Sequence, residues 1–216
     1  MPGQGPTGNT RNPGLRCVCQ NLQKRYRRTD VLKGCDLILS AGETVGLVGE
    51  NGSGKTTLVK TLLGFVRPSG GTAWVSSSVG YSPQENYLNR RLTVAEHFHL
   101  MRRLNGDRRS ADAGWRESVI DRLKLRSVLS TRIDRLSGGT YQKVKFATAV
   151  LQLPEVVILD EPTDGFDWAM YLVFWEIMDE MRRRGISSLV ISHFLYDRQK
   201  FDRIVEMREG RCENAA

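Results

Sequence analysis

Apolar and polar residues alternate in two stretches near the start of the chain. Residues 15–20 and 31–39 place an apolar side chain at about every second position, which predicts half-buried antiparallel strands. Residues 156–159 and 188–192 are instead short and almost continuously apolar, as in parallel strands buried on both faces. Residues 42–48 predict another strand, which runs directly into a glycine-rich loop.

Other stretches repeat their apolar residues at helical spacing. Thr93 and Glu96 form a capping-box pattern that opens one such helix, and we expect its Phe98 and Leu104 to face inward. The pattern predicts helices over residues 55–66, 93–104, 115–129, 138–151 and 170–184, with further strands at 74–81 and 203–207.

This order of elements predicts the fold class. A strand, a glycine-rich loop and a helix, followed by buried strands separated by helices, indicate an α/β core of the P-loop type. The alternating strands near the start predict an antiparallel β-subdomain, and residues 85–150 a helical subdomain within the domain 15–216. Residues 1–14 are rich in Pro, Gly, Asn and Thr and predict a disordered lead.

Composition narrows the possible functions. The chain has 216 residues, 40% hydrophobic and 26% charged, which is typical of a globular protein, and no apolar run reaches the roughly 18 residues of a membrane span. The net charge is +8, but the arginines are scattered, so we expect a solvated basic surface and no nucleic-acid partner. Cys17 and Cys19 share one strand face without a matching second pair, which favours buried reduced thiols over zinc.

The glycine-rich loop carries the strongest chemical signal. Gly49-x-x-x-x-Gly54-Lys55-Thr56 matches the phosphate-binding pattern between a strand and a helix. Its backbone N–H groups and the helix N-terminus favour phosphate oxygens, Lys55 is suited to the β- and γ-phosphates, and the Thr56 hydroxyl to Mg²⁺. The loop therefore predicts binding of a nucleoside triphosphate.

Two further motifs follow along the chain. The buried strand at 156–159 ends in Asp160 and Glu161, and paired carboxylates there are costly without a cation, which favours a metal–phosphate site. Asp160 is suited to hold Mg²⁺, and Glu161 to polarise an attacking water. Leu136-Ser-Gly-Gly-Thr140 opens a helix, and it is either a second anion site or a simple serine-capped turn.

Together these motifs resemble the ABC-type ATPases, from about residue 15 to residue 211. The motifs that carry the resemblance stand in the family's order: Walker A (Gly49–Thr57), Q-loop (Ser82-Pro-Gln84), signature (Leu136-Ser-Gly-Gly-Thr140), Walker B (Val156–Glu161), D-loop (Asp164-Gly-Phe-Asp167) and switch histidine (Ile191-Ser-His193).

The resemblance implies a role for each matching residue. It implies ATP contacts at Tyr26 (adenine stacking), Gly49, Asn51, Gly52, Ser53, Gly54, Lys55, Thr56, Thr57, Gln84, Ser137 and Gly139, and Mg²⁺ contacts at Thr56, Gln84 and Asp160. Lys55, Glu161 and His193 would be catalytic. Ser137 and Gly139 would serve the ATP of a second copy, and Asp167 would cross that interface. The chain departs from the family pattern at Thr140 (usually Gln), Phe166 (usually Leu) and the bulky Trp168.

The resemblance also implies partners. We expect an ATP-hydrolysing subunit that pairs as a homo- or heterodimer and powers a separate integral membrane permease from the cytoplasmic face of the cell membrane. Residues 92–106 resemble stand-alone drug and antibiotic exporters, and no extra C-terminal domain follows the last strand, so export of a drug, antibiotic or peptide is favoured over import. A soluble ABC ATPase acting on cytosolic machinery, such as cluster assembly, is the alternative.

Overall fold

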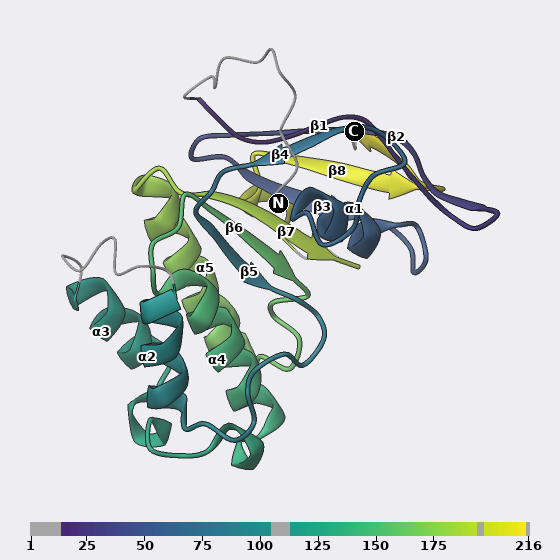
Figure 1. The fold of residues 1–216 in the computed structure, drawn as a ribbon. Coiled ribbons are helices and arrows are strands. Elements are labelled where there is room, and N and C mark those ends of the chain that lie inside the picture. The colour runs from purple at the N-terminus through teal and green to yellow at the C-terminus, as the bar shows by residue number, and fades with distance from the viewer. Residues whose placement is uncertain (1–13, 105–112, 194–196, 215–216) are drawn as a thin grey trace.

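The computed structural model describes residues 14–104, 113–193 and 197–214. The predicted disordered lead therefore lies, except for Gly14, outside the described residues. One antiparallel sheet contains β1 (Leu15–Tyr26), β2 (Thr29–Ser40) and β4 (Gly70–Val75) in the order β2-β1-β4. It lies above the rest of the molecule in Figure 1. The alternation at the start of the chain predicted β1 and β2 correctly.

The central sheet contains six strands in the order β5-β6-β7-β3-β8-β9. Their bounds are β3 (Thr44–Val48), β5 (Val79–Ser82), β6 (Val156–Asp160), β7 (Ser187–Ser192), β8 (Arg203–Arg208) and β9 (Arg211–Asn214). All neighbouring strands pair in parallel except β8 and β9, which pair antiparallel. The strand that precedes the glycine-rich loop, β3, therefore lies between β7 and β8, and its carboxyl end meets those of β6 and β7.

Helices cover the central sheet on both faces. Their bounds are α1 (Lys55–Leu62), α2 (Val94–Leu104), α3 (Ala113–Arg122), α4 (Gly138–Val150) and α5 (Trp168–Arg183), with short 3₁₀ turns at Arg126–Val128, Ile133–Arg135 and Arg198–Lys200. Helices α2, α3 and α4 extend away from the antiparallel sheet at the lower left of Figure 1. Among the described residues, no helix has the length and apolar character to cross a membrane.

The buried strands divide their side chains between two cores. Val156 and Ile158 of β6 join the core that contains α1 and the antiparallel sheet. Val157 and Leu159 join the other core, with α2, α3, α4 and α5. Because side chains alternate along a strand, a continuously apolar strand can serve both cores at once. Asp160 is the last residue of this doubly buried strand, and Glu161 follows it directly.

Some predicted elements were wrong in extent. The single strand predicted at 74–81 is two strands in different sheets, β4 and β5, separated by the polar run Ser76–Ser78. The helix predicted to end at residue 66 ends at Leu62, since Gly64 follows with φ of 76°. Helix α3 ends at Arg122, before Lys124 with φ of 56°, so the helix predicted to reach residue 129 is shorter.

Helix α2 confirms its predicted start but not its whole inward face. Thr93 N–H donates to the Glu96 carboxylate at 2.8 Å, and Glu96 N–H donates to the Thr93 hydroxyl at 3.2 Å, which is a complete capping box. Phe98 is buried as expected. Leu104, predicted to face inward, is 70% exposed because it lies at the last residue of the helix, beyond the packed face.

Candidate active site

The glycine-rich loop connects the end of β3 to the start of α1. Gly54 caps α1 with φ of 112°, a left-handed conformation that favours glycine, and no side chain caps the helix. A Cβ on Gly49 would lie 2.4 Å from the Met207 backbone oxygen, so only glycine fits the close approach of the loop to β8. The first N–H groups of α1 are therefore left without a side-chain cap, which makes this helix end suitable for an anion.

Lys55 is the first residue of α1, and its side chain folds back over the loop. Its Nζ donates to the backbone oxygens of Gly49 at 2.6 Å and Glu50 at 3.0 Å, and the side chain is buried. Burial lowers the pKa of Lys55, and this effect is opposed by the nearby carboxylates of Glu161 and Asp160. The ammonium is thus held over the loop, where a bound phosphate chain would compete for the same donors. Within the described residues, the buried hydroxyl of Ser53 in the same loop has no hydrogen-bond partner, so it is available to a ligand.

A cavity of about 260 Å³ brings the separate motifs together. Its lining combines residues of the loop and α1 with residues from the ends of β5, β6 and β7: Asn51, Gly52, Gly54, Lys55, Thr56, Thr57, Gln84, Asp160, Glu161 and His193, together with Val31. Ten of the residues predicted from sequence therefore share one site. The parallel sheet explains this, because the carboxyl ends of its strands meet at one edge.

The donor set of this cavity fits Mg²⁺ bound together with a phosphate. Thr56, Gln84 and Asp160 offer a hydroxyl, an amide and a carboxylate, and Mg²⁺ prefers oxygen ligands. Within the described residues, no group of three or more His, Cys, Asp or Glu side chains could hold a metal ion. An ion at this site would therefore need water or phosphate oxygens to complete its coordination, as magnesium sites commonly do.

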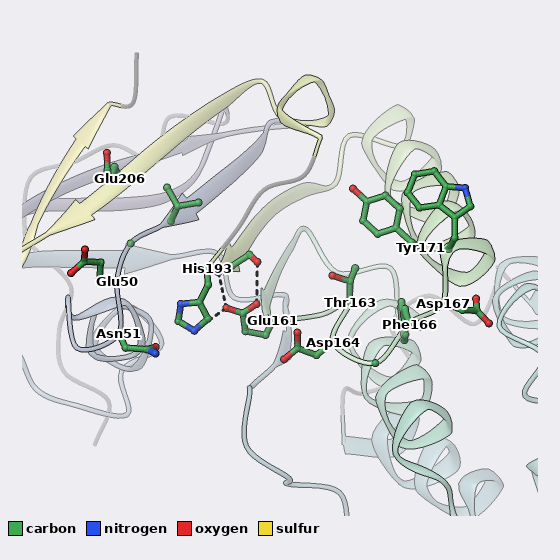
Figure 2. Close-up of a pocket in the computed structure, with 15 residues that line it drawn as sticks. Glu50, Asn51, Glu161, Thr163, Asp164, Phe166, Asp167, Tyr171, His193 and Glu206 are labelled. Carbon is green, nitrogen blue, oxygen red and sulfur yellow. Dashed lines mark hydrogen bonds and ion pairs between the residues drawn. The ribbon is translucent and has the colours of Figure 1, made fainter.

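The Glu161 carboxylate is held in one position by the end of β7. His193 N–H donates to its Oε1 at 2.8 Å, and the Ser192 hydroxyl donates to its Oε2 at 3.0 Å. The His193 Nε2 atom lies 3.4 Å from the same Oε1. Figure 2 shows the imidazole and the carboxylate turned toward one another. Glu161 also has φ of 48°, a strained value for a residue other than glycine, which such sites commonly tolerate.

The two adjacent carboxylates shape the electrostatics of the cavity. Burial, and then the charge of Glu161, raise the pKa of Asp160 to about 6, although Lys55, Lys145 and His193 act in the opposite direction. An added cation would relieve this repulsion, since it favours the ionised form of both carboxylates. The chemistry of the pair thus matches the metal–phosphate site expected from the sequence.

Two residues of α4, which sequence reasoning missed, connect this helix to the cavity. The buried Gln142 donates from Nε2 to the Glu161 backbone oxygen at 2.8 Å. Lys145, only 2% exposed, donates from Nζ to the Gln84 backbone oxygen at 3.0 Å. The sequence signal for Lys145 is a lysine within the otherwise apolar run from Val144 to Ala147. These bonds fix the signature helix against both the Q-loop and the end of β6.

Five of the predicted residues are not among those that line this cavity: Gly49 and Ser53 belong to the loop itself, whereas Tyr26, Ser137 and Gly139 lie on other parts of the chain. Tyr26 ends β1, on the antiparallel sheet, and Lys24 Nζ lies 4.8 Å from the centre of its ring, so one face of the ring already has a cation over it. Ser137 caps α4 and donates to the Thr140 hydroxyl at 2.9 Å. Ser137 and Gly139 line neither this cavity nor the larger one described next. Thr140, the departure from the family pattern, therefore fixes the orientation of the Ser137 hydroxyl.

A larger cavity of about 1060 Å³ opens beside the first one. Figure 2 shows Glu50, Asn51 and Glu206 on one side, Glu161 and His193 in the middle, and Asp164, Phe166 and Asp167 on the other side. Trp168 and Tyr171, from the start of α5, also line it. The catalytic candidates are therefore open toward a wide acidic space.

Comparisons with known proteins identify related sequences. A family model described as "ABC transporter" matches residues 32–164. The zinc import ATP-binding protein ZnuC of Buchnera aphidicola subsp. Acyrthosiphon pisum is 36% identical over 186 residues, which cover 84% of this chain and 74% of that protein. The Nod factor export ATP-binding protein I of Burkholderia lata is 31% identical over 205 residues, which cover 89% of this chain and 67% of that protein.

Solved structures give the same fold. One described as an ATP-binding subunit of an ABC transporter superposes with a TM-score of 0.85 at 26% identity, covering 93% of this chain and 90% of that one. One described as a dimeric bacterial ABC transporter cassette has a TM-score of 0.80 at 21% identity, covering 91% and 96%. These likenesses confirm the predicted fold class, a mixed α/β cassette with an antiparallel sheet and a helical part.

Proposed function

The chain belongs to the ABC transporter family of ATP-binding proteins, and we propose that its cavity binds Mg·ATP as half of a composite site that is completed by a second subunit. ABC ATPases of this family hydrolyse ATP to power transport. The observation that carries the proposal is the single cavity that contains Lys55, Thr56, Gln84, Asp160, Glu161 and His193.

The glycine-rich loop and α1 would bind the nucleotide. The uncapped N–H groups at the start of α1 and the Lys55 ammonium would hold the β- and γ-phosphates. Thr56, Gln84 and Asp160 would hold Mg²⁺, which when bound neutralises phosphate charge. Tyr26 would stack on adenine through the ring face opposite Lys24. If Lys24 moves away, the other ring face is also open to adenine.

The residues at the carboxyl ends of β6 and β7 would carry out ATP hydrolysis. Ser192 and His193 hold the Glu161 carboxylate, so Glu161 is positioned to orient a water and accept its proton. His193 is half-buried beside it and is suited to donate to the γ-phosphate. Phosphoryl transfer needs positioning and charge stabilisation more than covalent chemistry, which this arrangement supplies without a protein nucleophile.

A second subunit would complete the site. Ser137 and Gly139 lie outside the chain's own phosphate cavity. A Cβ on Gly138 would meet nothing within 4 Å, and one on Gly139 only an ordinary contact, so the chain's own packing does not require either glycine. Because the chain's own packing leaves these positions open, the pair fits a close approach by a group from outside the chain. An ATP bound to a second copy is such a group.

The tests follow from these assignments. Lys55→Ala should weaken ATP binding itself, while Glu161→Gln should keep ATP binding and lower hydrolysis by on the order of 10²- to 10⁴-fold, the usual contribution of a general base. Equilibrium ATP binding and steady-state phosphate release measure both. Hydrolysis by Glu161→Gln at the parent rate would show that Glu161 is not the general base. Unchanged ATP binding by Lys55→Ala would contradict the assignment of the loop as the phosphate-binding site.

We further propose that the dimer docks on a separate integral membrane permease at the cytoplasmic face of the cell membrane, and that it powers export of a drug, antibiotic or peptide. The Nod factor export relative, similar over 89% of this chain, supports export. Import is the second candidate, favoured by the 36% identity to a zinc import protein. Co-purification with a membrane protein tests docking, and recovery with soluble partners alone would favour the cytosolic alternative. ATP-driven uptake into inverted vesicles would support export, and ATP-driven release would support import.

A further inference from the structure

The start of α5 presents an exposed apolar face, which we call the α5 aromatic patch and define as Trp168, Tyr171 and Leu172. These residues are spaced i, i+3 and i+4, so they lie on one side of the helix. Trp168 is 71% exposed and Leu172 45% exposed. Nothing in the proposed hydrolysis of ATP uses this patch, and a tryptophan this exposed contributes little to the chain's own core.

The patch is nevertheless rigid. Trp168 stacks on Tyr171, with ring centres 5.4 Å apart and planes 16° apart, and Tyr171 meets the buried Trp175 edge-on at 6.3 Å. Trp175 in turn meets Phe201 edge-on at 5.1 Å. The Asp167 carboxylate caps the helix by accepting from Met170 N–H at 2.8 Å. An exposed indole fixed in place before binding is the type of group that contributes most at protein interfaces.

The patch is continuous with the candidate active site. Trp168 and Tyr171 line the cavity of about 1060 Å³ that also contains Gly49, Glu161 and His193. On the adjoining side, the Gly165 backbone oxygen lies 3.4 Å from the position of a Cβ on Gly139. The D-loop and the signature turn are therefore neighbours, and a partner that reaches Ser137 and Gly139 also approaches Trp168.

The charge around the patch narrows the possible occupants. Asp164 and Asp167 are exposed beside Trp168, and Glu50 and Glu206 line the other side of the cavity. These carboxylates would repel an anionic membrane surface. A protein partner remains, and the adjoining signature turn already calls for a second copy of this chain.

We propose that a second copy of this chain covers the α5 aromatic patch when ATP closes the dimer, and that Trp168 is a main contact of that interface. The inference rests on the proposed function, since it takes the composite site as given. It assigns to Trp168 a role that the ATP chemistry leaves open. Two-fold symmetry would make each contact occur twice, so the loss of one side chain is felt at both halves of the interface.

Tryptophan fluorescence tests the proposal directly. Of the four tryptophans, all within the described residues, Trp115 and Trp175 are buried, Trp74 is half-buried and Trp168 alone is highly exposed. Acrylamide quenching of the Glu161→Gln protein, with Trp168→Phe to identify the signal, should reveal one accessible indole without nucleotide. Mg·ATP should protect that indole, and Mg·ADP should not. Sedimentation of the same samples reports whether dimers form.

The possible outcomes distinguish the composite ATP site from the interface role of Trp168. ATP-dependent dimers in which Trp168 remains fully quenchable would overturn the inference while leaving the composite site intact. Bound ATP without any dimer would overturn the composite site and the inference together.

A second variant measures the contribution of the contact. Trp168→Ala should raise the dimer dissociation constant with ATP by on the order of tenfold or more, as for an interface hot spot, with ATP affinity of the monomer unchanged. The matched control is Phe65→Ala, which removes an aromatic side chain that is 67% exposed but outside the patch, and it should leave dimerisation unchanged. Equal dimerisation by Trp168→Ala and the parent protein would overturn the proposal.

Discussion

Replacing Asp160 with asparagine should stabilise the nucleotide-free chain, although it should damage the site. The pKa of Asp160 rises from an ordinary value of 3.8 to about 6, because the carboxyl is buried and lies beside Glu161. The folded chain therefore binds a proton at Asp160 more tightly than the unfolded chain does. Between about pH 4 and pH 6 the folded state holds more protons, so stability falls as pH rises through this window.

The magnitude follows from the same pKa. A rise from 3.8 to about 6 corresponds to a cost of about 3 kcal/mol for keeping Asp160 ionised at neutral pH. Asparagine resembles the protonated acid in shape and charge, so Asp160→Asn should recover up to about 3 kcal/mol above pH 6 and much less near pH 4. For a chain of this size, about 3 kcal/mol raises the melting temperature by roughly 6–12 °C.

Thermal unfolding in EDTA without nucleotide, at about pH 5 and about pH 8, measures this difference. Asp164→Asn is the matched control, because that carboxylate is exposed and its removal should change stability little. Added Mg·ATP should stabilise the parent protein more than Asp160→Asn. The reasoning is refuted if Asp160→Asn melts at or below the parent temperature at pH 8, or if its gain does not shrink toward acid pH.

Three further predictions concern the helical part of the molecule. Lys145→Met should lower the free energy of unfolding by about 2 kcal/mol in denaturant titrations, because the Gln84 backbone oxygen loses its charged donor at 3.0 Å. An unchanged unfolding midpoint would show that this hydrogen bond does not stabilise the fold. His97 is buried with a lowered pKa, so its contribution is fully present above about pH 6.5 and declines below it; the melting temperature of His97→Gln should fall less on acidification than that of the parent, and equal slopes would contradict this. Thr93→Ala should cost about 1 kcal/mol of unfolding free energy through the lost capping box, with a difference near zero as the contrary result.

The residues that the sequence assigns to a phosphate site lie close together in the structure, because they are local in the chain or follow from sheet geometry. Gly49 to Thr57 form one continuous loop, and Asp160 and Glu161 end an apolar strand whose burial is evident from its composition. Parallel strands then bring their carboxyl ends together, which places Gln84 and His193 in the same cavity. Roles for these residues remain predictions, and the sequence implied the proximity of Gln84 and His193 only through the resemblance to the family.

The features that the sequence did not predict depend on tertiary contacts. Three of the four residues of strand β9, Arg211–Asn214, are polar or charged, and its strand structure depends on pairing with β8. A lysine is usually found at the surface, yet Lys145 is covered by the Q-loop, where it donates to the Gln84 backbone oxygen. The run of serines between Trp74 and Tyr81 conceals a change of sheet, since a propensity for strand does not specify its partner.

The central claim is that one chain supplies only half of each ATP site, and mixing two inactive variants tests it most directly. Lys55→Ala keeps the signature turn and lacks the phosphate grip, whereas Ser137→Arg keeps the grip and blocks the turn. Neither variant alone should hydrolyse ATP. In a mixed dimer one site combines the intact loop of one chain with the intact turn of the other, so an equal mixture should recover about a quarter of the parent ATPase rate, as random pairing gives half mixed dimers with one good site each. Full activity of Ser137→Arg alone, or no recovery in mixed dimers verified by differently tagged chains, would contradict the composite site.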